Sequence, residues 1–242
     1  MNCLNCKFFL HEEIKTITNG KCTKHTSYFA CKHEKAERRG IAFLGKSISP
    51  GDIPYACPLI NTPILIGLCG DPGSGKDTVA KILRDKYKFM NLSFAERGKK
   101  IINEIFDLDS DQLWGNKKEI IDERYNKTPR QIMQIIIHGF RKVNEDVWIN
   151  YIRKEMKNYY FNLFVISDVR MKNEFKFIKE NNGIIIKVVR PDLNFTPSHI
   201  TDTDIKDEKP DYIIINNKNV SDLEENVISL MESIKKECIK NV

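Results

Sequence analysis

The residues with the clearest chemical potential form a glycine-rich loop at 70–78, which reads GDPGSGKDT. An apolar run at 64–69 precedes the loop, and helical periodicity follows it through Leu83. In such a strand–loop–helix unit, glycines let consecutive backbone N–H groups turn toward one phosphate, while the lysine reaches the outer phosphates of a nucleotide. The segment therefore predicts a nucleoside triphosphate site made by Gly70, Gly73, Ser74, Gly75, Lys76, Asp77 and Thr78.

The residue after the lysine departs from the usual phosphate-loop pattern. A Ser or Thr at this position normally ligates magnesium, but this chain has Asp77, followed by Thr78. A carboxylate at this place can hold magnesium through water or contact an acceptor group. Thr78 can instead take over the hydroxyl role, and the sequence leaves both interpretations open.

A second group of charged residues follows another apolar run, at 162–167. Asp168 comes directly after this run and Arg170 two residues later. Ligands of α/β proteins bind outside the carboxyl ends of the strands. Asp168 is therefore predicted to orient magnesium or its water, and Arg170 to neutralise charge on a transferred phosphoryl group. Glu174, one helical turn further on, is predicted to assist them.

The remaining patterns predict the frame that positions these residues. Further strands are expected at 183–190 and 211–216, and amphipathic helices at 96–106, 128–140, 144–158, 171–181 and 221–239. This alternation is typical of an α/β fold, a doubly wound domain with a central parallel sheet flanked by helices. The apolar runs are far shorter than the roughly 18 to 20 residues that cross a bilayer, so no membrane span is expected.

Composition limits the class of protein. The 242 residues suffice for one large domain or for a medium domain with a small one. With 41% hydrophobic and 30% charged residues, the chain is expected to fold as a soluble protein, with the cytoplasm as its default location. The net charge of +6 is spread along the chain and favours anionic ligands weakly. Nucleic acid is not expected as a partner, because the sequence shows no clustered basic helix or aromatic platform.

Five of the seven cysteines fall in the first 60 residues. Cys3 and Cys6 form a C-x-x-C pair, and Cys22 resembles a second knuckle, which together favour a structural zinc ion in a small module. The candidates for the fourth zinc ligand are Cys57, Cys31 and His25. The predicted ligands are Cys3, Cys6, Cys22 and Cys57, because Cys57 would tie the end of the module to its start. An iron centre or a set of free thiols are the alternatives.

The cysteine-rich part and the phosphate-loop part are predicted to be separate units. Residues 46–62 are rich in Pro, Gly and Ser, as expected of a connection. The predicted organisation is a zinc-binding module at 1–60 and a larger domain at 61–242.

Four segments in the larger domain resemble the bacteriophage deoxynucleoside monophosphate kinases. They are the loop at 70–80, Ser93-Phe94-Ala95, Thr128-Pro129-Arg130-Gln131 and Ser167-Asp168-Val169-Arg170. The resemblance spans about residues 64 to 230, in the same order. It implies a P-loop kinase fold that uses ATP and Mg²⁺ to phosphorylate deoxynucleoside monophosphates, in host cytoplasm if the protein is phage-encoded. Whether the chain forms a homodimer stays open.

The resemblance also implies roles for individual residues. It places Asp77 and Thr78 in the active site, and it assigns the Asp-x-Arg-x-x-x-Glu pattern of Asp168, Arg170 and Glu174 to the catalytic centre. Arg190 is expected to reach ATP, and 192–210 to form a lid. The implied contacts of the acceptor nucleotide are Lys99, Arg130, Gln134, Arg141, Trp148 and Arg170.

The sequence leaves the base preference and the exact function open. A bulkier Ile137-His138 pair occupies a place where the family has small residues, so base preference is not given; His138 is interpreted as a core histidine. Lys117 and Lys118 are interpreted as solvated surface lysines. The alternative functions are another P-loop small-molecule kinase, acting on phosphomevalonate or dephospho-coenzyme A, and a nucleotide-gated nucleic-acid-binding protein.

Overall fold

The computed structural model describes residues 64–158, 163–194, 196 and 203–234 in full, and the backbone alone of 9–18, 21–31, 43–45 and 235–240. The N-terminal backbone forms an antiparallel sheet of β1 (Phe9–Thr18), β2 (Lys21–Cys31) and β3 (Phe43–Gly45). Cys22 lies on β2, whereas Cys3, Cys6 and Cys57 lie outside the described residues. The predicted zinc module and the boundary near residue 61 thus stay predictions.

A five-stranded parallel sheet forms the centre of the larger domain. Its strands stand in the order β5-β6-β4-β7-β8 and have the bounds β4 Ile64–Cys69, β5 Met90–Leu92, β6 Leu163–Ile166, β7 Ile184–Val189 and β8 Tyr212–Ile215. All four pairings are parallel. The central strands β4 and β6 are buried along their whole length, as expected for strands that have helices on both faces.

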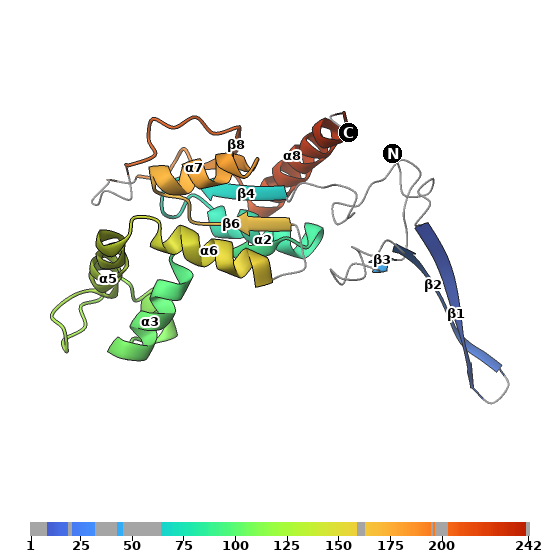
Figure 1. Cartoon of the computed structure of the whole chain (residues 1–242), viewed down its shortest axis with the longest axis horizontal. Coiled ribbons are helices and arrows are strands. Elements are labelled where there is room, and N and C mark those ends of the chain that lie inside the picture. Colours follow the sequence, from blue (N-terminus) through green and yellow to red (C-terminus); the bar gives the residue numbers. More distant parts are fainter. Residues whose placement is uncertain are drawn as a thin grey trace.

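Seven helices are described around this sheet: α2 Lys76–Tyr87, α3 Glu96–Phe106, α4 Ser110–Leu113, α5 Pro129–Val143, α6 Val147–Asn158, α7 Lys172–Glu180 and α8 Val220–Lys240. On one face, Leu65 of β4 packs in a core with α3, α5, α6 and α7. On the other face, Ile66 packs in a core with α2 and α8. Figure 1 shows α3 and α5 at one end of the domain and α8 at the opposite end.

The predicted α/β fold is confirmed, with three local differences. The three-residue strand β5 and the short helix α4 are absent from the expectations above, since neither is long enough to show a period. α6 begins at Val147 rather than near 144, because Asn144 ends α5 in an extended conformation and its side chain accepts a hydrogen bond from the Asp146 N–H. Within the described part of the chain, no helix combines the length and apolar character that a bilayer crossing requires.

Candidate active site

The phosphate loop connects β4 to α2 in the conformation that the glycines allow. Gly70 has a φ of 136°, and a Cβ there would lie 2.2 Å from the carbonyl oxygen of Val188, so no other residue fits. Gly75, with a φ of 106°, is the N-cap of α2 and provides no side-chain cap. The first N–H groups of a helix have no partner within it. The N-terminus of α2 can therefore offer them to an anion.

Lys76 is held against this loop. Its side chain is only 7% exposed, and its Nζ donates hydrogen bonds to the carbonyl oxygens of Gly70 at 2.8 Å and Asp71 at 2.7 Å. Burial, together with repulsion by Arg170, lowers the pKa of Lys76 to about 8. A buried ammonium of this kind gains stability from a neighbouring polyanion.

A pocket of about 490 Å³ opens beside the loop, at the carboxyl ends of the strands. Residues from α3, α5, α7 and the segment between α4 and α5 form its other walls. Its charged lining has more bases than acids; it comprises Lys76, Lys99, Lys118, Arg130, Arg141 and Arg170 against Asp77, Glu96, Asp168 and Glu174. Because bases outnumber acids, the pocket favours an anionic ligand.

Asp168 anchors the start of α3. Its carboxylate accepts hydrogen bonds from Ser93 Oγ at 2.7 Å, from the Phe94 N–H at 2.8 Å and from the Ala95 N–H at 3.0 Å. Three of its acceptor positions are thus taken by the protein. This arrangement joins the end of β6 to the segment after β5, and it fixes the wall of the pocket from which Lys99 extends.

Glu174 forms a buried ion pair at the back of the pocket. The side chain is 1% exposed, and Oε1 accepts a hydrogen bond from Arg141 Nη2 at 2.6 Å. Oε2 accepts hydrogen bonds from the backbone N–H groups of Arg170 and Met171. Burial raises the pKa of Glu174 to about 7, although the charge of Arg141 acts in the opposite direction. Glu174 therefore positions two arginines, Arg141 by its side chain and Arg170 by its backbone.

The wall opposite the phosphate loop carries Lys99, Arg130 and Gln134, three of the expected acceptor contacts, together with residues that the sequence analysis set aside or missed. Arg130 is paired with Glu119. His138, interpreted above as a core residue, is half-buried and lines the pocket.

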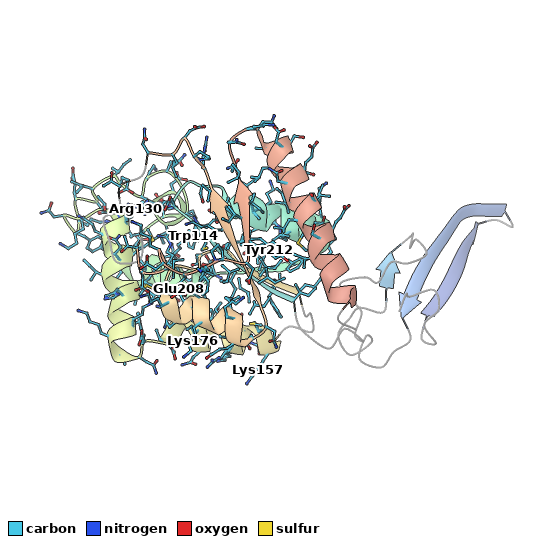
Figure 2. The ribbon with its side chains drawn as sticks, turned by 90° about the horizontal axis from the view of Figure 1, so that it is seen from above. Trp114, Arg130, Lys157, Lys176, Glu208 and Tyr212 are labelled. Atoms are coloured by element: carbon cyan, nitrogen blue, oxygen red, sulfur yellow. The ribbon has the colours of Figure 1, made fainter. Side chains whose placement is uncertain are left out.

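An aromatic side chain also belongs to this wall. Trp114 is 39% exposed, its Nε1 donates to Glu96 Oε2 at 3.0 Å, and Lys99 Nζ lies 5.9 Å from the centroid of its ring. Trp114 and Arg130, labelled in Figure 2, lie on the side of the domain where α5 is found, away from α8.

Trp148 lies behind this wall instead of on it. Its side chain is 4% exposed, its Nε1 donates to the carbonyl oxygen of Ile137 at 3.1 Å, and its ring meets Phe140 edge-on with 5.3 Å between centroids. The reason is the packing of α6 against α5, which buries Trp148 in the core. Trp114, and not Trp148, therefore lines the pocket.

Other predicted residues stay near the site without lining the pocket. Thr78 is half-buried in the first turn of α2, and Arg190 is exposed after β7. The loop residues Gly70, Ser74 and Gly75 also lie outside the pocket lining, and Gly70 and Gly75 set the loop conformation by their positive φ angles. The predicted lid at 192–210 connects β7 to β8, and residues 195 and 197–202 of it lie outside the described part.

Asn216 supports the loop and was not predicted. Its Nδ2 donates to the carbonyl oxygen of Ser74 at 2.9 Å, and a Cβ on Gly75 would lie 2.5 Å from the same nitrogen. Asn216 follows β8 and is 142 residues from Ser74. No local pattern relates the two, so only the fold brings them together.

The described residues were compared with what a bound Mg²⁺ ion requires. Within the described residues, no group of three or more His, Cys, Asp or Glu side chains could hold a metal ion on its own. Mg²⁺ does not need such a group, since it is commonly bound by one or two carboxylates together with substrate phosphates. Asp77 is exposed, lies next to Lys76 and lines the pocket, so its carboxylate fits that mode of binding.

A parallel sheet with a phosphate loop after its central strand, opening on a cationic pocket, defines a P-loop kinase. The family model "Deoxynucleotide monophosphate kinase" matches residues 107–227. A relative from Acanthamoeba polyphaga mimivirus, whose name places it among the deoxynucleotide monophosphate kinases, is 33% identical over an alignment of 187 positions that covers 70% of this chain and 97% of the relative. The chain belongs to the deoxynucleotide monophosphate kinase family.

Solved structures show weaker similarity. A dephospho-CoA kinase from Campylobacter jejuni is 16% identical with a TM-score of 0.40, and covers 72% of this chain and 98% of its own. TT1252 from Thermus thermophilus is 15% identical with a TM-score of 0.38, and covers 71% and 98%. Similarities of this size do not specify a substrate.

Proposed function

We propose that this protein transfers the γ-phosphoryl group of ATP to the α-phosphate of a deoxynucleoside monophosphate. An oxygen of the acceptor phosphate attacks the γ-phosphorus, the bond from that phosphorus to the β–γ bridging oxygen breaks, and ADP leaves. The acceptor phosphate is already ionised, so the attack requires no strong base. The observation that carries the proposal is the cationic pocket between the phosphate loop and the opposite wall, because this pocket offers room for a second anionic substrate beside the donor.

The side chains of the pocket divide into two groups in this proposal. Lys76 and the N-terminal amides of α2 bind the β- and γ-phosphates, as Lys76 already lies on the loop. Asp77 would hold Mg²⁺ together with the donor phosphates, and the ion would reduce their negative charge. Arg170 lies next to the transferred group, whereas Lys99, Arg130 and Arg141 offset the charge of the acceptor.

The test is a panel of acceptors. Purified protein with ATP and Mg²⁺ is given each of the four deoxynucleoside monophosphates, phosphomevalonate and dephospho-coenzyme A, and ADP release is followed. We expect turnover with at least one deoxynucleoside monophosphate and none with the other two acceptors. ATP hydrolysis that needs polynucleotide and no monophosphate would contradict the proposal and favour a nucleic-acid-binding role.

We further propose that Trp114 is the aromatic surface that meets the base of the acceptor. Stacking of a base on an aromatic side chain contributes roughly 1 to 3 kcal/mol, so Trp114→Ala should raise the KM for the acceptor about tenfold. The chain has two tryptophans. Titration with a deoxynucleoside monophosphate should therefore change the intrinsic fluorescence of wild type and of Trp148→Phe, but not that of Trp114→Phe. A change that survives in Trp114→Phe and vanishes in Trp148→Phe would assign the contact to Trp148.

We also propose a zinc ion on Cys3, Cys6, Cys22 and Cys57. The spacing of these cysteines supports it, together with the need of a small cysteine-rich segment for a second source of stability. Elemental analysis of the whole protein measures the metal directly.

A further inference from the structure

Lys118 occupies a different environment from the lysine beside it. Both residues lie in the segment between α4 and α5. The side chain of Lys117 is 51% exposed and pairs with Asp111 at 3.6 Å. Lys118 is half-buried and lines the pocket. The interpretation of both as solvated surface lysines therefore holds for Lys117 and is corrected for Lys118.

The surroundings of Lys118 are crowded with positive charge. Burial lowers the pKa of Lys118, and the charges of Lys99, Arg130 and Arg170 lower it further, while Asp77 acts in the opposite direction. Like charges held together in a partly buried place repel one another unless an anion lies among them.

Of the four acids that line the pocket, Glu96, Asp168 and Glu174 are bonded to other groups, and only Asp77 acts on Lys118. Asp168 accepts three hydrogen bonds from the segment after β5, and Glu174 pairs with Arg141. Glu96 accepts a hydrogen bond from Trp114 Nε1. Glu119, which follows Lys118 in the chain, pairs with Arg130. Among the described residues, no carboxylate forms an ion pair with Lys118 itself. The positive charge of Lys118 thus faces the pocket with no ion-pair partner, and the nearby charge of Asp77 compensates it only in part.

The backbone holds Lys118 in this place. The Arg130 N–H donates to the carbonyl oxygen of Lys118 at 3.1 Å, which joins the segment to the first turn of α5. Asp122, 8% exposed, accepts hydrogen bonds from Gln112 Nε2 and from Arg124 Nε and Nη2. These bonds connect the segment to α4 and fix its fold. A lysine on a fixed segment loses less entropy on binding a ligand than a lysine on a mobile one.

We propose that Lys118 binds the phosphate of the nucleotide acceptor, on the side of the pocket that faces Asp77. The inference rests on the proposed function, and it adds a residue that the sequence pattern did not select. Lys118 lies on the same wall of the pocket as Lys99 and Arg130, whereas Lys76 and the phosphate loop bind the donor phosphates. In this position the ammonium compensates the acceptor's charge where its oxygen approaches the γ-phosphoryl group.

The test compares Lys118→Met with Lys117→Met, which removes the same charge one residue away and outside the pocket. We expect Lys118→Met to lower kcat/KM for the deoxynucleoside monophosphate about a hundredfold and to change the KM for ATP less than about threefold. Lys117→Met should match wild type, and Lys118→Arg should restore part of the loss. Thermal unfolding of the three variants should match that of wild type, because no core packing is altered.

A binding measurement separates this inference from the proposed function. Calorimetric titration with the deoxynucleoside monophosphate alone should show affinity at least about tenfold weaker for Lys118→Met than for wild type and Lys117→Met. If wild type turns over an acceptor and Lys118→Met behaves as Lys117→Met does, the inference alone is overturned. If wild type binds the nucleotide through Lys118 but phosphorylates no acceptor, the proposed function fails and the inference stands. If wild type binds no deoxynucleoside monophosphate, both are overturned.

Discussion

Lys76→Met is expected to lower kcat by about a thousandfold or more while the fold stays intact. The lysine is the cation on the phosphate loop, and methionine has a similar length without a charge. Charge that develops on the β–γ bridging oxygen as the bond breaks would lose its nearest compensating group. Steady-state assays with saturating ATP measure the effect, and Lys81→Met, which alters an exposed lysine of the same helix, is the matched control. Substantial turnover by Lys76→Met would show that the lysine is only structural.

The same variant should change how stability depends on pH. The pKa of Lys76 is about 8 in the folded protein and 10.5 for an ordinary lysine, so the unfolded chain binds the proton more tightly. Below pH 8 both states are protonated, and the buried charge costs about 3 kcal/mol. Wild-type stability should therefore gain from this group as pH rises from 8 to 10.5, a gain that Lys76→Met lacks. Urea unfolding at pH 7 and pH 10 tests this, with Lys76→Met at least as stable as wild type at pH 7.

Glu174→Ala is expected to lower the free energy of unfolding by about 3 kcal/mol or more. The change leaves the N–H groups of Arg170 and Met171 without their acceptor and the guanidinium of Arg141 without its partner. Since both arginines lose their support, kcat/KM should also fall at least about tenfold under conditions where the variant is folded. Urea unfolding and acceptor kinetics on the same preparation measure the two effects.

Two further variants control this result. Glu180→Ala removes an exposed acid that pairs with Lys176 on the same helix, and it should change stability by less than about 0.5 kcal/mol. Glu174→Gln keeps an oxygen for the two backbone N–H groups, so its loss of stability should be smaller than that of Glu174→Ala. Equal stability of Glu174→Ala and wild type would mean that the buried pair does not hold the site together.

The sequence by itself determined the parts of this protein that depend on neighbours along the chain. The apolar run at 64–69, the glycine loop and the helix after it form a local unit, because glycine conformations and helix periodicity act over a few residues. The placement of Asp168 and Arg170 at the end of β6 follows in the same way, since strand ends in a parallel sheet share one edge. The parallel α/β sheet and its larger helices were predicted correctly for this reason.

Only the tertiary structure decided which of two similar residues reaches the pocket. Trp148 and Trp114 are both tryptophans near charged residues, yet the packing of α6 on α5 buries the first and leaves the second in the wall. Lys117 and Lys118 are adjacent, and a hydrogen bond from the Arg130 N–H ties the backbone of Lys118 to α5. The burial and the electrostatic surroundings of a residue arise from contacts between elements far apart in the chain, and a local sequence pattern does not specify those contacts.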